Sequence, residues 1–208
     1  MRPPRHAVGE AQVPFIQQLT TENVGAIVVS AADPAVTAPA LQAARQAGIK
    51  VVGYDSSPAP GAYDVFVNQV DPQSVGQQLV AAACDEAPSC SGDIGVLSST
   101  PTASNQNAWI AAMQQTLTEP QYAGLNLVDV VYGNDDPQTS QQQTEALLQE
   151  DPNLKVIVSP TTVGILAAAI VLEATGNAGM VQLTGLGTPN DMRPYVADGT
   201  VKEFGLSK

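Results

Sequence analysis

The chain alternates short, β-branched apolar runs with longer stretches of helical pattern. The apolar runs span residues 24–29, 50–54, 65–67, 93–97, 127–132, 156–158 and 181–186. They are almost continuously apolar, as strands of a parallel sheet covered on both faces are. The helical stretches lie near residues 10–22, 34–47, 72–86, 104–118, 137–149, 161–176 and 189–198. This alternation predicts an α/β fold.

Several of the expected strand-to-helix junctions share one chemistry. Each has Asp, Ser or Thr followed by Pro, at residues 33–34, 71–72, 136–137, 159–160 and 188–189. The side-chain oxygen accepts free N–H groups of the first helical turn, and Pro at the first helical position removes an N–H that has no partner there. The pairs therefore mark the places where strands give way to helices.

The segment 85–92 is the best candidate for a linker, because it contains Pro, Ser and Gly and is bracketed by Cys84 and Cys90. It divides the chain into a first part with three expected strands and a second with at least four, which residues 201–206 would extend by one more strand. The two cysteines are close enough in sequence for a small-loop disulfide in an oxidising compartment, and two free thiols are the equal alternative.

The charge balance argues against anionic partners. Eight Lys and Arg residues stand against twenty Asp and Glu residues, a net charge of −12. Nucleic acid and anionic membrane surfaces are poor partners for such a chain. No apolar run is long enough to cross a membrane, and the basic start at residues 1–6 has no apolar stretch behind it, so the given sequence shows no export signal. We expect a neutral ligand.

Catalytic and metal-binding motifs are missing from the sequence. The single histidine, His6, lies in a Pro-rich terminus and is a poor general base for a nucleophile. Two cysteines and one histidine are too few for a zinc site, and there is no G-x-S-x-G or P-loop motif. We therefore expect neither an enzyme nor a cofactor nor a bound metal.

Polar residues follow the carboxyl ends of expected strands, where open α/β sheets bind ligands. These candidates are Asp55, Asn105, Gln106, Pro160 and Thr162. Amides and hydroxyls both donate and accept hydrogen bonds, which suits a neutral polyhydroxylated ligand. Each residue also has an ordinary interpretation, as a turn acid for Asp55 and as helix-opening residues for the others.

Five segments carry a resemblance to a known family: residues 28–30, 54–56, 66–69, 98–109 and, most specifically, 187–206. They resemble periplasmic sugar-binding proteins of ABC transporters, of the rhamnose-binding and autoinducer-2-binding type. The resemblance implies the type I periplasmic binding protein fold, with two Rossmann-like lobes that close over a sugar. Family members are about half as long again, so both termini are expected to be incomplete. Residues 1–90 would form a partial N-terminal lobe, and residues 91–208 a C-terminal lobe without its return crossover.

The resemblance also implies ligand-binding roles for a strand-end acid at Asp55, a polar pair at Asn105 and Gln106, and a loop at Pro160 and Thr162. Autoinducer-2 binders of this type have Asp-Gln in the pair and Ala in the loop. Since this chain has Asn105 and Thr162 there, a rhamnose-like deoxyhexose is favoured. The implied partner is a membrane permease, and the implied location is outside the cytoplasm.

Two alternatives remain beside the rhamnose interpretation. One is an autoinducer-2-binding protein of the same family. The other is the sugar-sensing effector domain of a transcription regulator, which would need a basic helix-turn-helix head and which the net charge of −12 disfavours. Whichever holds, a chain that lacks an interior strand would expose sheet edges and apolar helix faces, so we expect poor solubility or self-association of the 208 residues.

Overall fold

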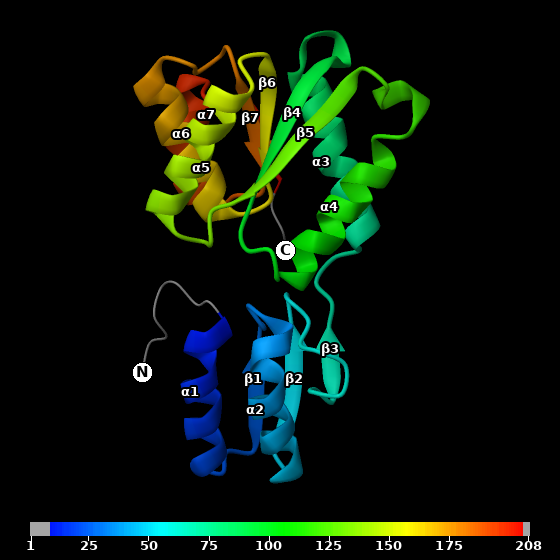
Figure 1. Cartoon of the computed structure of the whole chain (residues 1–208), viewed down its shortest axis with the longest axis vertical. Helices are drawn as coiled ribbons and strands as arrows, with labels where there is room; N and C mark the ends of the chain where they lie inside the picture. Colours follow the sequence, from blue (N-terminus) through cyan, green and yellow to red (C-terminus); the bar gives the residue numbers. More distant parts are fainter. Residues whose placement is uncertain (1–8, 206–208) are drawn as a thin grey trace. The chain divides into compact units, whose positions relative to one another are not determined.

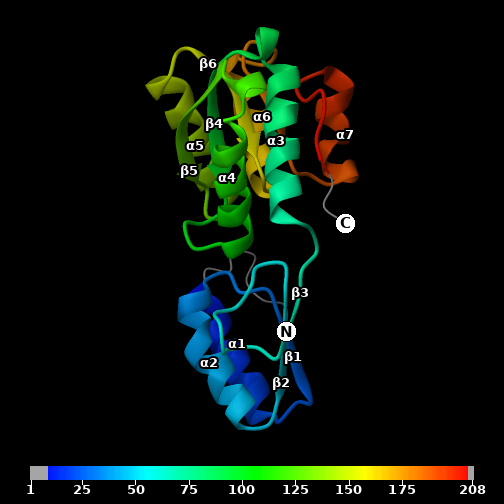
Figure 2. The same ribbon diagram turned by 90° about the vertical axis from the view of Figure 1, so that its right-hand side faces the viewer.

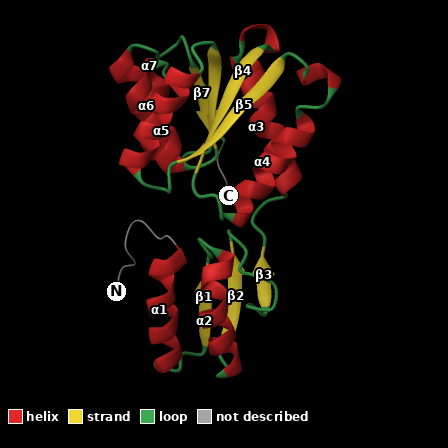
Figure 3. Cartoon of the chain, viewed as in Figure 1, coloured by secondary structure: helices red, strands yellow, loops and turns green. Residues whose placement is uncertain are grey.

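The computed structural model describes residues 9–205, which leaves His6 outside the described part. The chain divides into two compact units. Unit 1 comprises Met1–Asp71 and Thr102–Asn107, and unit 2 comprises Pro72–Pro101 and Ala108–Lys208. Figure 3 shows that each unit has strands accompanied by helices, which confirms the α/β class.

Unit 1 is a parallel sheet with two helices. Its elements are α1 (Gly9–Thr21), β1 (Ala26–Val29), α2 (Pro34–Gln46), β2 (Lys50–Tyr54) and β3 (Val65–Val67), and the strand order is β1-β2-β3. Both helices lie on the same side of the strands (Figure 2). The core of unit 1 lies between these helices and the sheet. It includes Ile16 of α1, Ile27 of β1, Leu41 of α2 and Val51 of β2.

The opposite face of this sheet is apolar and exposed. Val28 is 66%, Tyr54 47%, and Val65 and Val67 each 55% exposed. The parallel register pairs Val28 with Val52, Val52 with Val65, and Tyr54 with Val67, so these residues share one face. We call Val28, Val52, Tyr54, Val65 and Val67 the open face of unit 1.

Unit 2 contains a four-stranded parallel sheet in the order β5-β4-β6-β7. Its strands are β4 (Gly92–Ser98), β5 (Leu125–Tyr132), β6 (Leu154–Ser159) and β7 (Gln182–Gly185). Its α-helices are α3 (Pro72–Glu86), α4 (Ser104–Thr116), α5 (Pro137–Glu150), α6 (Thr162–Thr175) and α7 (Pro189–Asp198), and η1 (Pro88–Cys90) and η2 (Pro120–Tyr122) are short 3₁₀ turns. The first turn of α4 groups with unit 1 and the rest of the helix with unit 2.

Helices cover both faces of the unit 2 sheet (Figure 1). Ile94 and Val96 of β4 pack with α3 and α4, whereas Leu97 packs in the core formed with α5, α6 and α7. Because consecutive residues of β4 are buried on opposite sides, the strand has no polar alternation. The continuous apolar runs in the sequence are explained by this double coverage.

The junction chemistry is confirmed at two helices. Asp33 accepts from the backbone N–H groups of Ala35 and Val36 at 2.9 and 3.0 Å. Asp136 accepts from the N–H of Thr139 at 2.8 Å. Both helices then begin with Pro, as the pairs predicted.

The predicted caps of α6 and α7 were wrong in detail. α6 begins at Thr162 rather than after Ser159, and the buried Ser159 hydroxyl instead donates to the carbonyl of Leu97 at 2.8 Å. At α7, Thr188 makes no side-chain cap hydrogen bond, and its hydroxyl donates to the Asp191 carboxylate. A hydroxyl, unlike a carboxylate, can turn its proton toward another acceptor.

The segment 85–92 does not separate the compact units. Cys84 and Cys90 form a disulfide that closes a tight turn between α3 and β4, and Leu79 and Val80 of α3 pack in the core of unit 2. The chain instead passes from one unit to the other after Asp71, after Pro101 and after Asn107. The assignment of residues 1–90 and 91–208 to lobes of a longer fold stays a prediction.

Within the described part of residues 201–206, the expected extra strand is only an isolated parallel bridge between Leu186 and Gly205.

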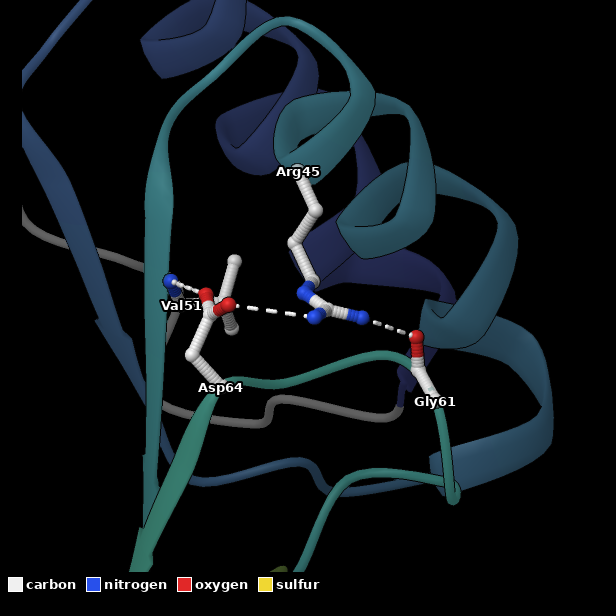
Figure 4. A network of polar contacts seen from close by, with 4 residues as sticks. All are labelled: Arg45, Val51, Gly61 and Asp64. Carbon is white, nitrogen blue, oxygen red and sulfur yellow. Dashed lines mark hydrogen bonds and ion pairs between the residues drawn. The ribbon is translucent and has the colours of Figure 1, made fainter.

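A polar network holds the β2–β3 connection of unit 1 against α2 (Figure 4). The Arg45 guanidinium donates to the carbonyl of Gly61 at 2.6 Å and to Asp64 Oδ1 at 3.0 Å. The other Asp64 oxygen accepts from the N–H of Val51 at 2.8 Å. The hydrogen bond from Arg45, together with that from Val51, lowers the pKa of Asp64 below its ordinary value.

Candidate functional site

Asp55 is the centre of a polar cluster in unit 1. Its Oδ1 accepts from Gln69 Nε2 at 2.7 Å and from Asn105 Nδ2 at 2.8 Å, and its Oδ2 accepts from the Ser30 hydroxyl at 2.9 Å. We call Ser30, Asp55, Gln69 and Asn105 the Asp55 cluster. Its members are one carboxylate, one hydroxyl and two amides, a set that can both donate to and accept from a hydroxylated ligand.

Strand topology explains how the cluster forms. Ser30 directly follows β1, Asp55 directly follows β2, and Gln69 lies two residues beyond β3. Since the three strands are parallel, their carboxyl ends lie along one edge of the sheet, where α/β folds bind ligands. Asp55 has a left-handed backbone with φ of 55°, a conformation that Asp and Asn adopt more readily than most residues.

Asn105 reaches the cluster because the start of α4 is anchored to the segment after β2. The buried Ser56 hydroxyl accepts from the N–H of Ser104 at 3.2 Å and lies 3.0 Å from the Ser104 hydroxyl. Ser104 also donates to the carbonyl of Ser57 at 3.3 Å. The first turn of α4 is thereby held beside Asp55, although 50 residues separate Asn105 from Asp55 in the chain.

The orientation of the Asn105 amide is fixed by two opposite partners. Its Nδ2 donates to Asp55, and its Oδ1 accepts from the backbone N–H of Gln106 at 2.7 Å. The side chain of Gln106 lies in the same turn and is only 7% exposed. The structure thus brings Asp55 and Asn105 into contact and places Gln106 next to them in sequence but buried.

Pro160 and Thr162 belong to unit 2, where they flank the start of α6. In this sheet β4 lies between β5 and β6, so the winding reverses there and the ligand-binding edge of the fold is at the ends of β4 and β6. The loops at that edge are tied together, since Thr161 donates to Asp135 at 2.8 Å and the N–H of Asn134 donates to the carbonyl of Ser99 at 2.7 Å. The ligand-binding role of Pro160 and Thr162 stays a prediction.

Sequence reasoning missed Ser30 and Gln69 as members of the Asp55 cluster. Both lie in segments that carried the family resemblance, but neither was selected as a candidate. Both follow predicted strands, at 24–29 and 65–67, so the rule that selected Asp55 would have selected them too. Their hydrogen bonds to one carboxylate, however, depend on the register of the strands, which only the structure shows.

Residues 9–205 contain no candidate metal site and no candidate membrane span. No group of three or more His, Cys, Asp and Glu side chains in this range is arranged to hold a metal ion. Likewise, none of the helices in this range has the length and apolar character needed to span a membrane.

Solved structures of proteins with bound small molecules are similar to this chain. A solute-binding protein of an ABC transporter from Clostridium phytofermentas, with bound L-rhamnose, is 41% identical with a TM-score of 0.95, over 100% of this chain and 65% of that one. A protein from Clostridium saccharobutylicum in complex with AI-2 is 26% identical with a TM-score of 0.87, over 94% of this chain and 63% of that one.

A curated relative and a family model agree with these structures. The D-ribose/D-allose-binding protein of Pseudomonas aeruginosa is 26% identical over 195 residues, which are 92% of this chain and 60% of the relative. The chain thus spans about two thirds or less of the length of the relatives it matches. The model of the periplasmic binding protein domain matches residues 2–208. The chain therefore belongs to the periplasmic binding protein domain family.

Proposed function

We propose that this chain is the solute-binding part of a carbohydrate ABC transporter and that it binds a neutral sugar of the rhamnose type without transforming it. The observation that carries the proposal is the Asp55 cluster, in which one carboxylate is surrounded by a hydroxyl and two amides at the ligand-binding edge of a parallel sheet. The similarity to the L-rhamnose-bound structure supports the choice of sugar.

Affinity for a neutral sugar requires several such groups together. A micromolar dissociation constant corresponds to about −8 kcal/mol, whereas a neutral hydrogen bond contributes about 0.5–1.5 kcal/mol and one to a charged group about 1.5–3 kcal/mol. The carboxylate of Asp55 is therefore expected to be the strongest single contact. Asn105 would add another, and Gln106, Pro160 and Thr162 are the remaining candidates.

The proposal includes a partner and a location. A solute-binding protein delivers its sugar to a membrane permease, and it works outside the cytoplasm. The Cys84–Cys90 disulfide supports that location, because disulfides persist in oxidising compartments and are rare in the cytosol.

The test is isothermal titration of L-rhamnose into the 208-residue chain and its Asp55 variants. Asp55→Asn should weaken binding about tenfold, because a charge-assisted hydrogen bond becomes a neutral one. Asp55→Ala should abolish the rise in melting temperature that the sugar causes. Asp129→Asn is the matched control, since Asp129 is an exposed acid on β5 of unit 2. Unchanged rhamnose affinity in Asp55→Ala would contradict the proposal.

Autoinducer-2 is a second candidate ligand, since the AI-2-bound structure also resembles the chain. Asn105 and Thr162 differ from the residues that the autoinducer-2 binders have at these places, which favours the rhamnose-type sugar. Parallel titrations with L-rhamnose and autoinducer-2 decide between the two by the tighter ligand.

A further inference from the structure

The two amides that bind Asp55 differ in their freedom. Asn105 is held from both ends, by Asp55 and by the N–H of Gln106. Gln69 is exposed, and in the described part of the chain its side chain makes one hydrogen bond, to Asp55. It follows β3 closely enough to remain at the sheet edge but is not itself in a strand. Of the two donors on Oδ1, Gln69 is therefore the one that can move.

The acceptor sites of Asp55 are already partly used. Oδ1 has two protein donors and Oδ2 has one, while a carboxylate offers about four acceptor sites in all. A sugar hydroxyl that binds Oδ2 shares the carboxylate with the Gln69 amide, which donates to Oδ1. A hydroxyl that binds Oδ1 has to displace a donor, and Gln69 is the movable one. In both cases the hydroxyl and the Gln69 amide have the Asp55 carboxylate as a common partner.

We infer that Gln69 is a specificity-determining residue of the sugar site, which contacts the same sugar hydroxyl as Asp55. This inference rests on the proposed function. An amide offers both N–H groups and a carbonyl oxygen, so it can donate to the hydroxyl oxygen or accept its proton. A site that makes hydrogen bonds to a hydroxyl discriminates against analogues that lack it, because its own polar groups are then left unpaired.

The experiment crosses variants of the chain with deoxy analogues of the sugar. Gln69→Ala is titrated with L-rhamnose and with its 1-deoxy, 2-deoxy, 3-deoxy and 4-deoxy analogues by calorimetry. Gln46→Ala is the matched control, because Gln46 is an exposed glutamine of unit 1 at the end of α2, away from the carboxyl ends of the strands. Circular dichroism and urea midpoints confirm that both variants fold as the parent does.

We expect Gln69→Ala to weaken L-rhamnose binding about fivefold to tenfold, the effect of one lost hydrogen bond. For one of the deoxy analogues this loss should disappear, because the partner hydroxyl is already absent. Gln46→Ala should leave every affinity unchanged.

Two results would overturn the inference while the proposed function stands. One is that Gln69→Ala binds all the sugars as the parent and Gln46→Ala do. The other is that it loses the same factor for L-rhamnose and for every deoxy analogue, which would mean that Gln69 only orients Asp55. A parent chain that binds none of these sugars would instead overturn the proposed function, and the inference with it.

Discussion

Removing the Cys84–Cys90 disulfide should destabilise unit 2 measurably. The two cysteines are six residues apart in sequence. For a loop of that length, the chain-entropy relation gives a loss of about 7.4 cal/mol/K in the entropy of the unfolded state, or about 2.2 kcal/mol at 25 °C. Replacing both cysteines by serine removes this constraint and keeps side chains of similar size. The free energy of unfolding should therefore fall.

A second effect reduces that loss. Ser89 and Cys90, inside the closed loop, have left-handed backbones with φ of 57° and 51°, and such a conformation costs a non-glycine residue about 1–2 kcal/mol. Without the disulfide the loop can relax part of this strain. We therefore expect a net destabilisation of about 1–2 kcal/mol, below the value from chain entropy alone.

Trp109 makes the assay specific for unit 2. It is the one tryptophan of the sequence, it belongs to unit 2 and it is only 4% exposed. Urea unfolding followed by its fluorescence should show a lower midpoint for the Cys84→Ser/Cys90→Ser variant and for the parent treated with dithiothreitol. The variant itself should not respond to dithiothreitol. The reasoning is refuted when the oxidised and reduced parent unfold at the same midpoint.

Two further predictions concern unit 1. Because the pKa of Asp64 is lowered in the folded chain, its stabilising contribution is present above the unfolded pKa near 4 and is lost as the pH falls through the folded pKa. Arg45→Met should therefore lower the urea midpoint at pH 7 more than at pH 3, and an equal loss at both pH values would contradict this. The open face of unit 1 should cause self-association, which sedimentation at rising concentration would detect and which Val28→Thr with Val67→Thr should reduce; a parent chain that stays monomeric would show this expectation to be wrong.

Most of the strands could be predicted because each coincides with a short, almost continuously apolar run of the sequence. The runs at 50–54 and 65–67 match β2 and β3 residue for residue, and the other strands differ by one or two residues at their ends. β2 and β3 were predicted as doubly covered strands, yet unit 1 leaves their open face exposed. An apolar run therefore predicts that both faces of a strand are suited to burial. It does not predict which segment of the protein covers each face.

The unit boundaries could not be predicted, for a physical reason. The Pro, Ser and Gly residues of 85–92 were interpreted as a linker, whereas they form the disulfide-closed turn between α3 and β4. The boundaries fall between Asp71 and Pro72, between Pro101 and Thr102, and within α4 after Asn107. At the last of these, α4 continues across the boundary without a change of composition, so the sequence contains no signal for it.

The backbone of Asp55 determines which variant tests the site most cleanly. Asp55 has a φ of 55°, which costs alanine more than it costs asparagine, because Asn and Asp are enriched in this region. Asp55→Ala therefore removes the carboxylate, strains the turn and leaves three donors without their acceptor. Asp55→Asn keeps an oxygen for the two amides and lets the Ser30 hydroxyl turn to accept from the new amide group. A loss of sugar affinity in the asparagine variant without a loss of stability would thus assign the effect to the loss of the charged acceptor rather than to a strained turn.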